Sequence, residues 1–136
     1  MNLAEIPLFA MLKGRFQHLN ERQRLISQNV ANSDTPGYTP NDLKPFTFEM
    51  QMKAQMTGVT TQAVTQPGHM SPTTRKTNYR PIKTKDSETT LDGNSVVLEE
   101  EMMKMSEARM NYDAAIGFYQ KSLGLLRLAS RKPNGA

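Results

Sequence analysis

The stretch "NVANSDTPGYTP", Asn29–Pro40, decides how this chain folds, because it stops a helix and redirects the chain. Thr35–Tyr38 fits a type II turn, with proline at the second position and glycine at the third, where φ must be positive. The side chains of Asn32, Ser33 and Asp34 can hydrogen bond to the last backbone groups of a preceding helix. The stretch therefore predicts a helix that ends near Asn32 and an extended chain after it.

A helical repeat leads into this turn. Its apolar residues alternate at spacings of three and four, the pattern of a coiled-coil helix, with Gln23 as the single polar interruption. Pro7 suits the first turn of such a helix, where its missing N–H does little harm. The predicted seam of this helix consists of Phe9, Leu12, Phe16, Leu19, Ile26 and Val30.

A second helix with the same repeat is predicted near the C-terminal end, with Arg109 as its polar interruption. Asp92–Ser95 supplies turn and N-cap candidates. Acidic residues follow in its first turns and basic residues lie at its other end, which complements the helix dipole, and Pro133 marks the stop. About 35 residues would span roughly 50 Å. Its predicted seam consists of Leu98, Met102, Met105, Tyr112, Ile116, Tyr119, Leu123 and Leu126.

The C-terminal helix has more apolar residues than one seam requires. The glycines among them cost about 1 kcal/mol each relative to alanine, so they are easier to explain if another backbone comes close. We interpret these residues as a second contact face for neighbouring subunits; a loosely packed face that tolerates them is the alternative. The second contact face consists of Met103, Met110, Gly117 and Gly124, which recur every seven residues, with Phe118, Leu125 and Leu128 further round the helix.

The segment between the helices is rich in proline, threonine and glutamine. It can bury little apolar area, so we expect it to be mobile unless a partner orders it. A short strand pair around Val59–Val64 and Tyr79–Lys83 is an alternative for part of it. One apolar group interrupts this segment and either packs on the helices or has another role; it contains Phe46, Phe48, Met50 and Met52.

The expected fold is therefore all-α, with two long terminal helices that pair as a coiled coil and a largely irregular middle. Residues 1–38 form the N-terminal helix and its turn, residues 39–93 the flexible middle segment, and residues 94–136 the C-terminal helix. A chain of 136 residues is enough for one domain.

Several kinds of site are excluded by the residues present. The chain has no cysteine, so it has no disulfide or thiolate site. His18 and His69 have no paired carboxylate nearby, which predicts no metal site, and methionines at helical spacing are typical of adaptable packing. There is no nucleophile–base arrangement, phosphate loop or nucleotide fingerprint. The sequence predicts no enzyme and no cofactor.

The net charge of +4 is mild, with one tighter basic group at Arg75–Lys85. This group has no interleaved aromatic residue beyond Tyr79, so we predict a solvated linker and no binding of nucleic acid. No stretch is long and apolar enough to form a transmembrane segment. The N-terminus lacks the residue order of a cleavable signal. The chain is expected either to stay in the cytoplasm or to leave it without cleavage.

Two separated motifs carry a resemblance to a known family. "QNVANSDTPGYTPNDLKPF" resembles the N-terminal signature of the flagellar rod and hook family of axial proteins. "LDGNSVVLEEEMMKMSEARMNYDAAIGFYQKSLGLLRLA" resembles the C-terminal segment of its proximal rod members, and the short middle lacks the large inserted domain of hook-type relatives. The family turn motif is matched by Asn29, Ala31, Asn32, Thr35, Pro36, Gly37 and Tyr38.

The resemblance implies a structural subunit of the proximal rod of the bacterial flagellar basal body. Such proteins are exported unfolded by the flagellar type III apparatus, without a cleaved signal, and reach the periplasmic rod. Their terminal helices assemble with other copies, with other rod proteins, and next to the adaptor protein FliE and the export gate. The Phe-x-x-x-apolar export signal of the family is matched twice, at Phe46–Met50 and at Phe48–Met52.

Two other classes of function remain open at this point. One is a generic helical coiled-coil adaptor that binds a single protein partner through its seam. The other is a basic helical protein that binds membrane or nucleic acid, for which binding would fall sharply with salt. Ordering of the chain by polymerisation would favour the rod subunit.

Overall fold

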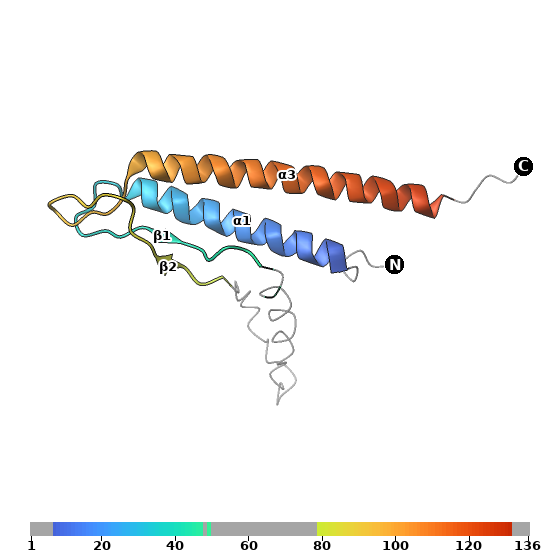
Figure 1. Ribbon diagram of the computed structural model, residues 1–136, viewed down its shortest axis with the longest axis horizontal. Helices are drawn as coiled ribbons and strands as arrows, with labels where there is room; N and C mark the ends of the chain where they lie inside the picture. The colour runs from blue at the N-terminus through green and yellow to red at the C-terminus, as the bar shows by residue number, and fades with distance from the viewer. Residues whose placement is uncertain (1–6, 48, 50–78, 132–136) are drawn as a thin grey trace, which may run out of the picture.

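Two antiparallel helices dominate the computed structural model, which describes residues 7–47, 49 and 79–131. Helix α1 (Pro7–Ala31) lies alongside helix α3 (Leu98–Ser130), with the end of α1 next to the start of α3 (Figure 1). The rings of Phe9 and Tyr119 meet edge-on at 5.5 Å between centroids, and those of Phe16 and Tyr112 at 5.3 Å. The predicted pairing of two long terminal helices is confirmed.

A two-stranded antiparallel ladder forms a further layer on the side of α1 away from α3 (Figure 1). Strand β1 (Asn41–Asp42) pairs with strand β2 (Ile82–Lys83), with Asn41 opposite Lys83 and Asp42 opposite Ile82. The predicted strand Tyr79–Lys83 contains β2, but its partner is β1. The other predicted strand, Val59–Val64, lies outside the described residues.

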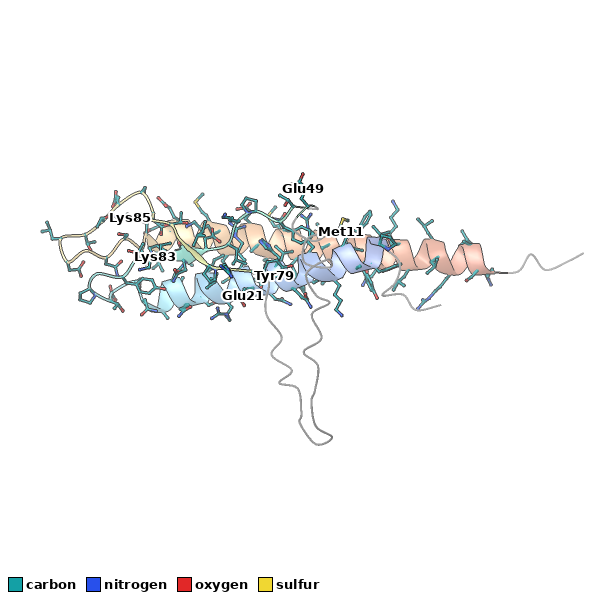
Figure 2. All side chains as sticks on the ribbon, turned by 90° about the horizontal axis from the view of Figure 1, so that it is seen from below. Met11, Glu21, Glu49, Tyr79, Lys83 and Lys85 are labelled. Atoms are coloured by element: carbon teal, nitrogen blue, oxygen red, sulfur yellow. The ribbon has the colours of Figure 1, made fainter. Side chains whose placement is uncertain are left out.

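Both ends of the middle segment contact α1. The His18 ring donates a hydrogen bond from Nε2 to the carbonyl of Lys44 at 2.7 Å, and the Tyr79 hydroxyl donates to the carbonyl of Gly14 at 2.8 Å. Leu43 is buried, and Tyr79 lies on the segment that crosses the helices (Figure 2). The composition of the segment did not predict these contacts, because they depend on a few side chains and on backbone carbonyls.

Helix α1 is the middle layer and is therefore buried on two faces, whereas α3 is buried on one. The buried residues of α1 are Phe9, Leu12, Gly14, His18, Leu19, Leu25, Ile26 and Asn29. On the longer α3 the buried residues are Glu101, Ala108 and Ala115. Most of the circumference of α3 consequently faces outward in the described part of the single chain.

The residues of α3 that face α1 agree with the predicted seam at every second position and lie one residue earlier at the others. The partly buried Met105, Tyr112 and Tyr119 belong to both, but Glu101 and Ala108 are buried where the prediction placed Met102 and Arg109. The small Ala108 and Ala115 are buried against α1, and the larger residues one position further along are less buried. Leu98 and Met102 are 42% and 60% exposed, and Ile116, Leu123 and Leu126 are half-buried.

The turn after α1 has the geometry that the sequence predicts. Gly37 has φ +72°, and the Tyr38 N–H donates to the Thr35 carbonyl at 3.2 Å. The Asn32 side chain donates to the carbonyl of Gln28 at 2.8 Å and so satisfies a carbonyl in the last turn of the helix. The structure therefore supports the predicted role of the stretch in ending α1.

The start of α3 differs from the prediction. The turn before the helix is Thr90–Gly93, the helix begins at Leu98, and its N-cap Val97 makes no side-chain cap bond. The Val97 N–H instead donates to Asp86 Oδ2 at 2.9 Å. The predicted cap was wrong because the Asn94 side chain bonds to the loop after α1, and Asp86 from the strand segment holds the residue just before the helix.

We expect Gly93→Ala to lower the free energy of unfolding by more than Gly37→Ala. Both glycines have positive φ, which costs an L-residue about 1 kcal/mol or more, but a Cβ on Gly93 would also lie 3.3 Å from the Gly37 Cα, whereas Gly37 has open space. Urea unfolding followed by helical circular dichroism measures the difference. Gly124→Ala, in helix α3 with open space around it, is the control and should stabilise the protein by about 0.5–1 kcal/mol. Equal losses for the two loop variants would contradict the close approach.

Candidate assembly interface

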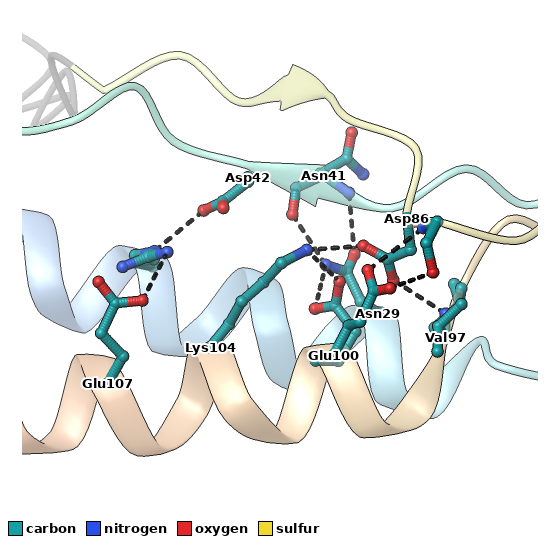
Figure 3. Close-up of polar contacts among 12 residues, drawn as sticks. Asn29, Asn41, Asp42, Asp86, Val97, Glu100, Lys104 and Glu107 are labelled. Atoms are coloured by element: carbon teal, nitrogen blue, oxygen red, sulfur yellow. Dashed lines mark hydrogen bonds and ion pairs between the residues drawn. The ribbon is translucent and has the colours of Figure 1, made fainter.

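A buried amide, Asn29, joins α1 to both neighbouring layers (Figure 3). Its Nδ2 donates to the Asn41 carbonyl at 2.8 Å and to Glu101 Oε2 at 2.9 Å. Its Oδ1 accepts from the Asn41 N–H at 2.9 Å and from the Tyr38 hydroxyl at 3.1 Å. Asn29 is only 1% exposed, and all four of its hydrogen-bonding positions are used. It is also the first residue of the turn motif.

The carboxylate opposite Asn29 belongs to a buried charged cluster. Glu101 is fully buried and also accepts from Lys104 Nζ at 2.8 Å. The same ammonium donates to Asp86 Oδ1 at 2.7 Å, while the other oxygen of Asp86 holds the start of α3 (Figure 3). Each buried charge thus has a partner of opposite sign, which offsets the cost of removing it from water.

Burial is the main influence on the ionisation of this cluster. It raises the pKa of Glu101, and the adjacent Asp86 carboxyl acts in the same direction, while hydrogen bonds from Lys104 and Asn29 oppose the rise. For Lys104 burial acts to lower the pKa, but its hydrogen bonds to Asp86 and Glu101 outweigh this and leave the pKa raised. The ammonium therefore stays charged and bridges the strand segment and α3.

A second amide, Asn94, ties the loop before α3 to the loop after α1. Its Nδ2 donates to the carbonyls of Asn32 and Thr35 at 2.9 and 2.7 Å, and its Oδ1 accepts from the Val96 N–H at 2.9 Å. The Ser95 N–H donates to the Tyr38 carbonyl at 2.9 Å. The turn motif therefore forms a junction between the two helices.

Not every motif position is inside this junction. Ala31 and Pro36 are exposed, and the Thr35 hydroxyl donates to Asn32 Oδ1 within its own loop at 3.1 Å. Sequence analysis identified one side of the junction, assigned Asn94 to a helix cap, and missed Asp86, Glu101 and Lys104. The heptad spacing of Glu101, Ala108 and Ala115 was the available signal, but a glutamate in an acidic first turn resembles an ordinary solvated residue.

The second contact face lies opposite the buried seam of α3. Met103, Met110 and Gly117 each come two residues after a buried position, about 200° round the helix. Gly117 and Gly124 have no neighbour within 4 Å of an added Cβ. The large residues of this face are exposed by half or more: Met103, Met110, Phe118, Leu125 and Leu128. The described part of the chain leaves this apolar surface uncovered, and such surfaces mark sites of protein association.

Phe46 lies against His18, with 5.6 Å between the ring centroids, and is half-buried. Phe48, Met50, Met52 and His69 lie outside the described residues. Burial lowers the pKa of His18, and its hydrogen bond to the Lys44 carbonyl only partly opposes this.

Within the described ranges there is no group of side chains that could hold a metal ion, and neither described helix could span a bilayer.

We predict that Asn29→Ala lowers the free energy of unfolding by about 3 kcal/mol. The substitution removes the Asn29 partner of Glu101 Oε2, of the Tyr38 hydroxyl and of the Asn41 backbone, and a buried unpaired group costs about 1–3 kcal/mol. The matched control is Asn20→Ala, the same change at an exposed position of α1, which should alter stability by less than about 0.5 kcal/mol. Urea titration of both variants gives the comparison. Similar stability of the two would show that the junction does not hold the helices.

No protein-family model matches the chain. The flagellar basal body rod protein FlgB of Agrobacterium fabrum (strain C58) is 32% identical over 118 residues, covering 82% of this chain and 84% of that protein. FlgB of Escherichia coli (strain K12) is 31% identical over 121 residues, covering 80% and 84%. FlgB of Bacillus subtilis (strain 168) is 23% identical over 105 residues, covering 77% and 78%. The similarity thus extends over most of each protein.

Proposed function

Because the chain belongs to the family of flagellar basal body rod proteins FlgB, we propose that it is a structural subunit of the proximal rod, exported by the flagellar type III apparatus and assembled through its terminal helices. The observation that carries the assembly proposal is the uncovered apolar face of α3, which runs along a helix of 33 residues. A subunit that forms a polymer needs such a surface, since each copy must bury area against its neighbours.

The junction at Asn29 supports the same role. It fixes the end of α1 against the start of α3, so the long apolar face is presented by one defined helix pair. Because α1 holds α3 in one position, the side chains of the second contact face lose little conformational freedom when they bind a neighbour. This favours association. Other copies of this chain, other rod proteins, FliE and the export gate are the proposed neighbours, in the periplasmic part of the basal body.

The spacing on α3 suggests how copies fit together. Met103 and Gly117 are 14 residues apart, as are Met110 and Gly124. A parallel copy displaced by 14 residues, about 21 Å along the helix, would set the two methionines at the level of the two glycines. The glycines leave room for an adjacent side chain, and methionine adapts its shape to such a space.

Leu125→Asp, Leu128→Asp and Gly117→Leu should each abolish rod assembly and motility while secretion and helix content change little. The aspartates would bury a charge against the neighbour, and the leucine would block close approach. The control is Gln120→Asp, an exposed residue about 140° round the helix from Leu125. Basal bodies purified from cells that carry each variant as the only copy are probed for the chain. Working flagella in all three variants would contradict the proposed face.

Export is proposed from the two overlapping Phe-x-x-x-apolar matches in the middle segment, at Phe46–Met50 and Phe48–Met52. In the folded chain Phe46 also contacts His18, so this residue serves the fold as well. The two roles are separable, because a chain that is exported unfolded does not make the folded contact during transit.

The double variant Phe46→Ala, Phe48→Ala should reduce secretion several-fold without reducing synthesis. Removing both rings eliminates both matches to the pattern. Phe118→Ala, the same change at a half-exposed position of α3, is the control and should be secreted normally. The measurement is the fraction of the chain outside the cytoplasm. Normal secretion of the double variant would leave Phe46 with a packing role only.

A further inference from the structure

Two stretches of the middle segment meet at one histidine of α1. We define these stretches as the stems: residues 43–47 follow β1, and residues 79–81 precede β2. The His18 ring lies 5.6 Å from the Phe46 ring of the first stem and 5.2 Å from the Tyr79 ring of the second, measured between ring centroids. One side chain of α1 therefore contacts both stems.

Hydrogen bonds accompany these ring contacts. His18 Nε2 donates to the Lys44 carbonyl of the first stem at 2.7 Å, so the proton of the neutral ring lies on Nε2. The Tyr79 hydroxyl of the second stem donates to the carbonyl of Gly14, about one turn earlier on α1, at 2.8 Å. The His18 side chain is buried, with 5% of the residue exposed. We call the contacts of His18 with Lys44, Phe46 and Tyr79 the clasp.

The charged groups around His18 come from three elements. Together with His18 they line a groove of about 440 Å³, which gives a proton a route to the side chain. Arg22 pairs with Asp42 at 3.2 Å and with Glu107 at 3.8 Å, so both carboxylates already have a guanidinium partner. A charged imidazolium would add positive charge beside two arginines. The four charged residues of the lining are Arg15 and Arg22 of α1, Asp42 of β1 and Glu107 of α3.

These surroundings favour the neutral ring. Burial has the largest influence and lowers the pKa of His18; the hydrogen bond to the Lys44 carbonyl opposes this, and the charge of Arg22 adds to it. The folded chain therefore binds a proton at His18 less readily than an unfolded chain, whose histidines titrate near pH 6.5, at about their ordinary pKa. The stabilising effect of the neutral ring is fully present above that pH and is lost as the pH falls toward the lowered pKa. Burial raises the pKa of Tyr79, so its hydroxyl stays neutral over this range.

We propose that His18 is a pH-sensitive switch: its neutral ring holds both stems on α1, and its protonation releases them together. The inference goes beyond the proposed function and does not depend on it, since it concerns the single folded chain. The junction at Asn29 contains no histidine and lies roughly 16 Å further along α1, so the helices stay paired when the stems leave. Acidity thereby uncovers one face of α1 without separating it from α3.

The buried charged cluster near the junction responds to pH with the opposite sign. Burial raises the pKa of Glu101, so its contribution to stability is greatest at low pH and is lost as the pH rises through the raised pKa. Loss of order on acidification is therefore expected at the stems and not at the start of α3. This difference in sign and in place separates the clasp from the cluster.

Hydrogen exchange of the purified full chain, followed by mass spectrometry at about pH 7.5 and about pH 5.5, tests the switch across the range in which histidine changes charge. Each rate is divided by the intrinsic exchange rate at the same pH. We expect protection of residues 43–47 and 79–84 to fall together several-fold at the lower pH, while residues 98–115 of α3 keep their protection.

Two substitutions assign the effect, because the chain has two histidines. His69→Gln leaves His18 as the one histidine and should show the same loss of protection as the unaltered chain. His18→Gln keeps an N–H donor for the Lys44 carbonyl but cannot become charged, so its stems should be equally protected at both pH values. If glutamine fails to hold the stems at either pH, the His69→Gln chain decides.

Three results would overturn the switch. One is equal protection of the stems at both pH values in the unaltered chain and in His69→Gln. Another is a loss of protection in one stem alone, or an equal loss in α3, which would mean that His18 does not release the stems as a unit. The third is the same pH dependence in His18→Gln as in the unaltered chain, which would assign the effect to another group.

Discussion

The hydrogen bonds of the buried Asn29 side chain are the constraint on which the rest of the structure depends. One amide reaches the strand segment through Asn41 and the second helix through Glu101, so three separate parts of the chain meet at one residue. A buried amide that uses every donor and acceptor admits one arrangement of its partners, since any shift would leave a polar group unpaired. Apolar side chains alone would tolerate sliding of one helix along the other.

The charged residues next to Asn29 extend this constraint to the start of α3. Asp86 accepts from the N–H of Val97, the residue just before the helix, and from Lys104, which also bonds to Glu101. The helix start is therefore determined by a residue of the strand segment, 11 positions before its N-cap. Local sequence around the helix start contains no such information, and for that reason the predicted cap was wrong.

The three-layer arrangement also explains the division of tasks between the helices. α1 is covered by α3 on one side and by the strand segments on the other, so it serves the fold. Among the described residues, α3 is covered on one side only and retains an apolar face that none of them covers. The FlgB relatives are rod proteins, and a helix pair with one covered and one open member is suited to building such a structure.

The sequence by itself determined the two helices, the turn at Gly37 and the presence of a second apolar face on α3. These features follow from residue spacing and from the backbone freedom of glycine, which are local properties. Only the tertiary structure decided which positions of α3 face α1, because the small Ala108 and Ala115 are buried there and a list of large apolar residues does not include them. It also decided that Asn29, Glu101, Lys104 and Asp86 are partners. Residues 72 positions apart, such as Asn29 and Glu101, become neighbours only when the helices pair, so their contact has no signal in the local sequence.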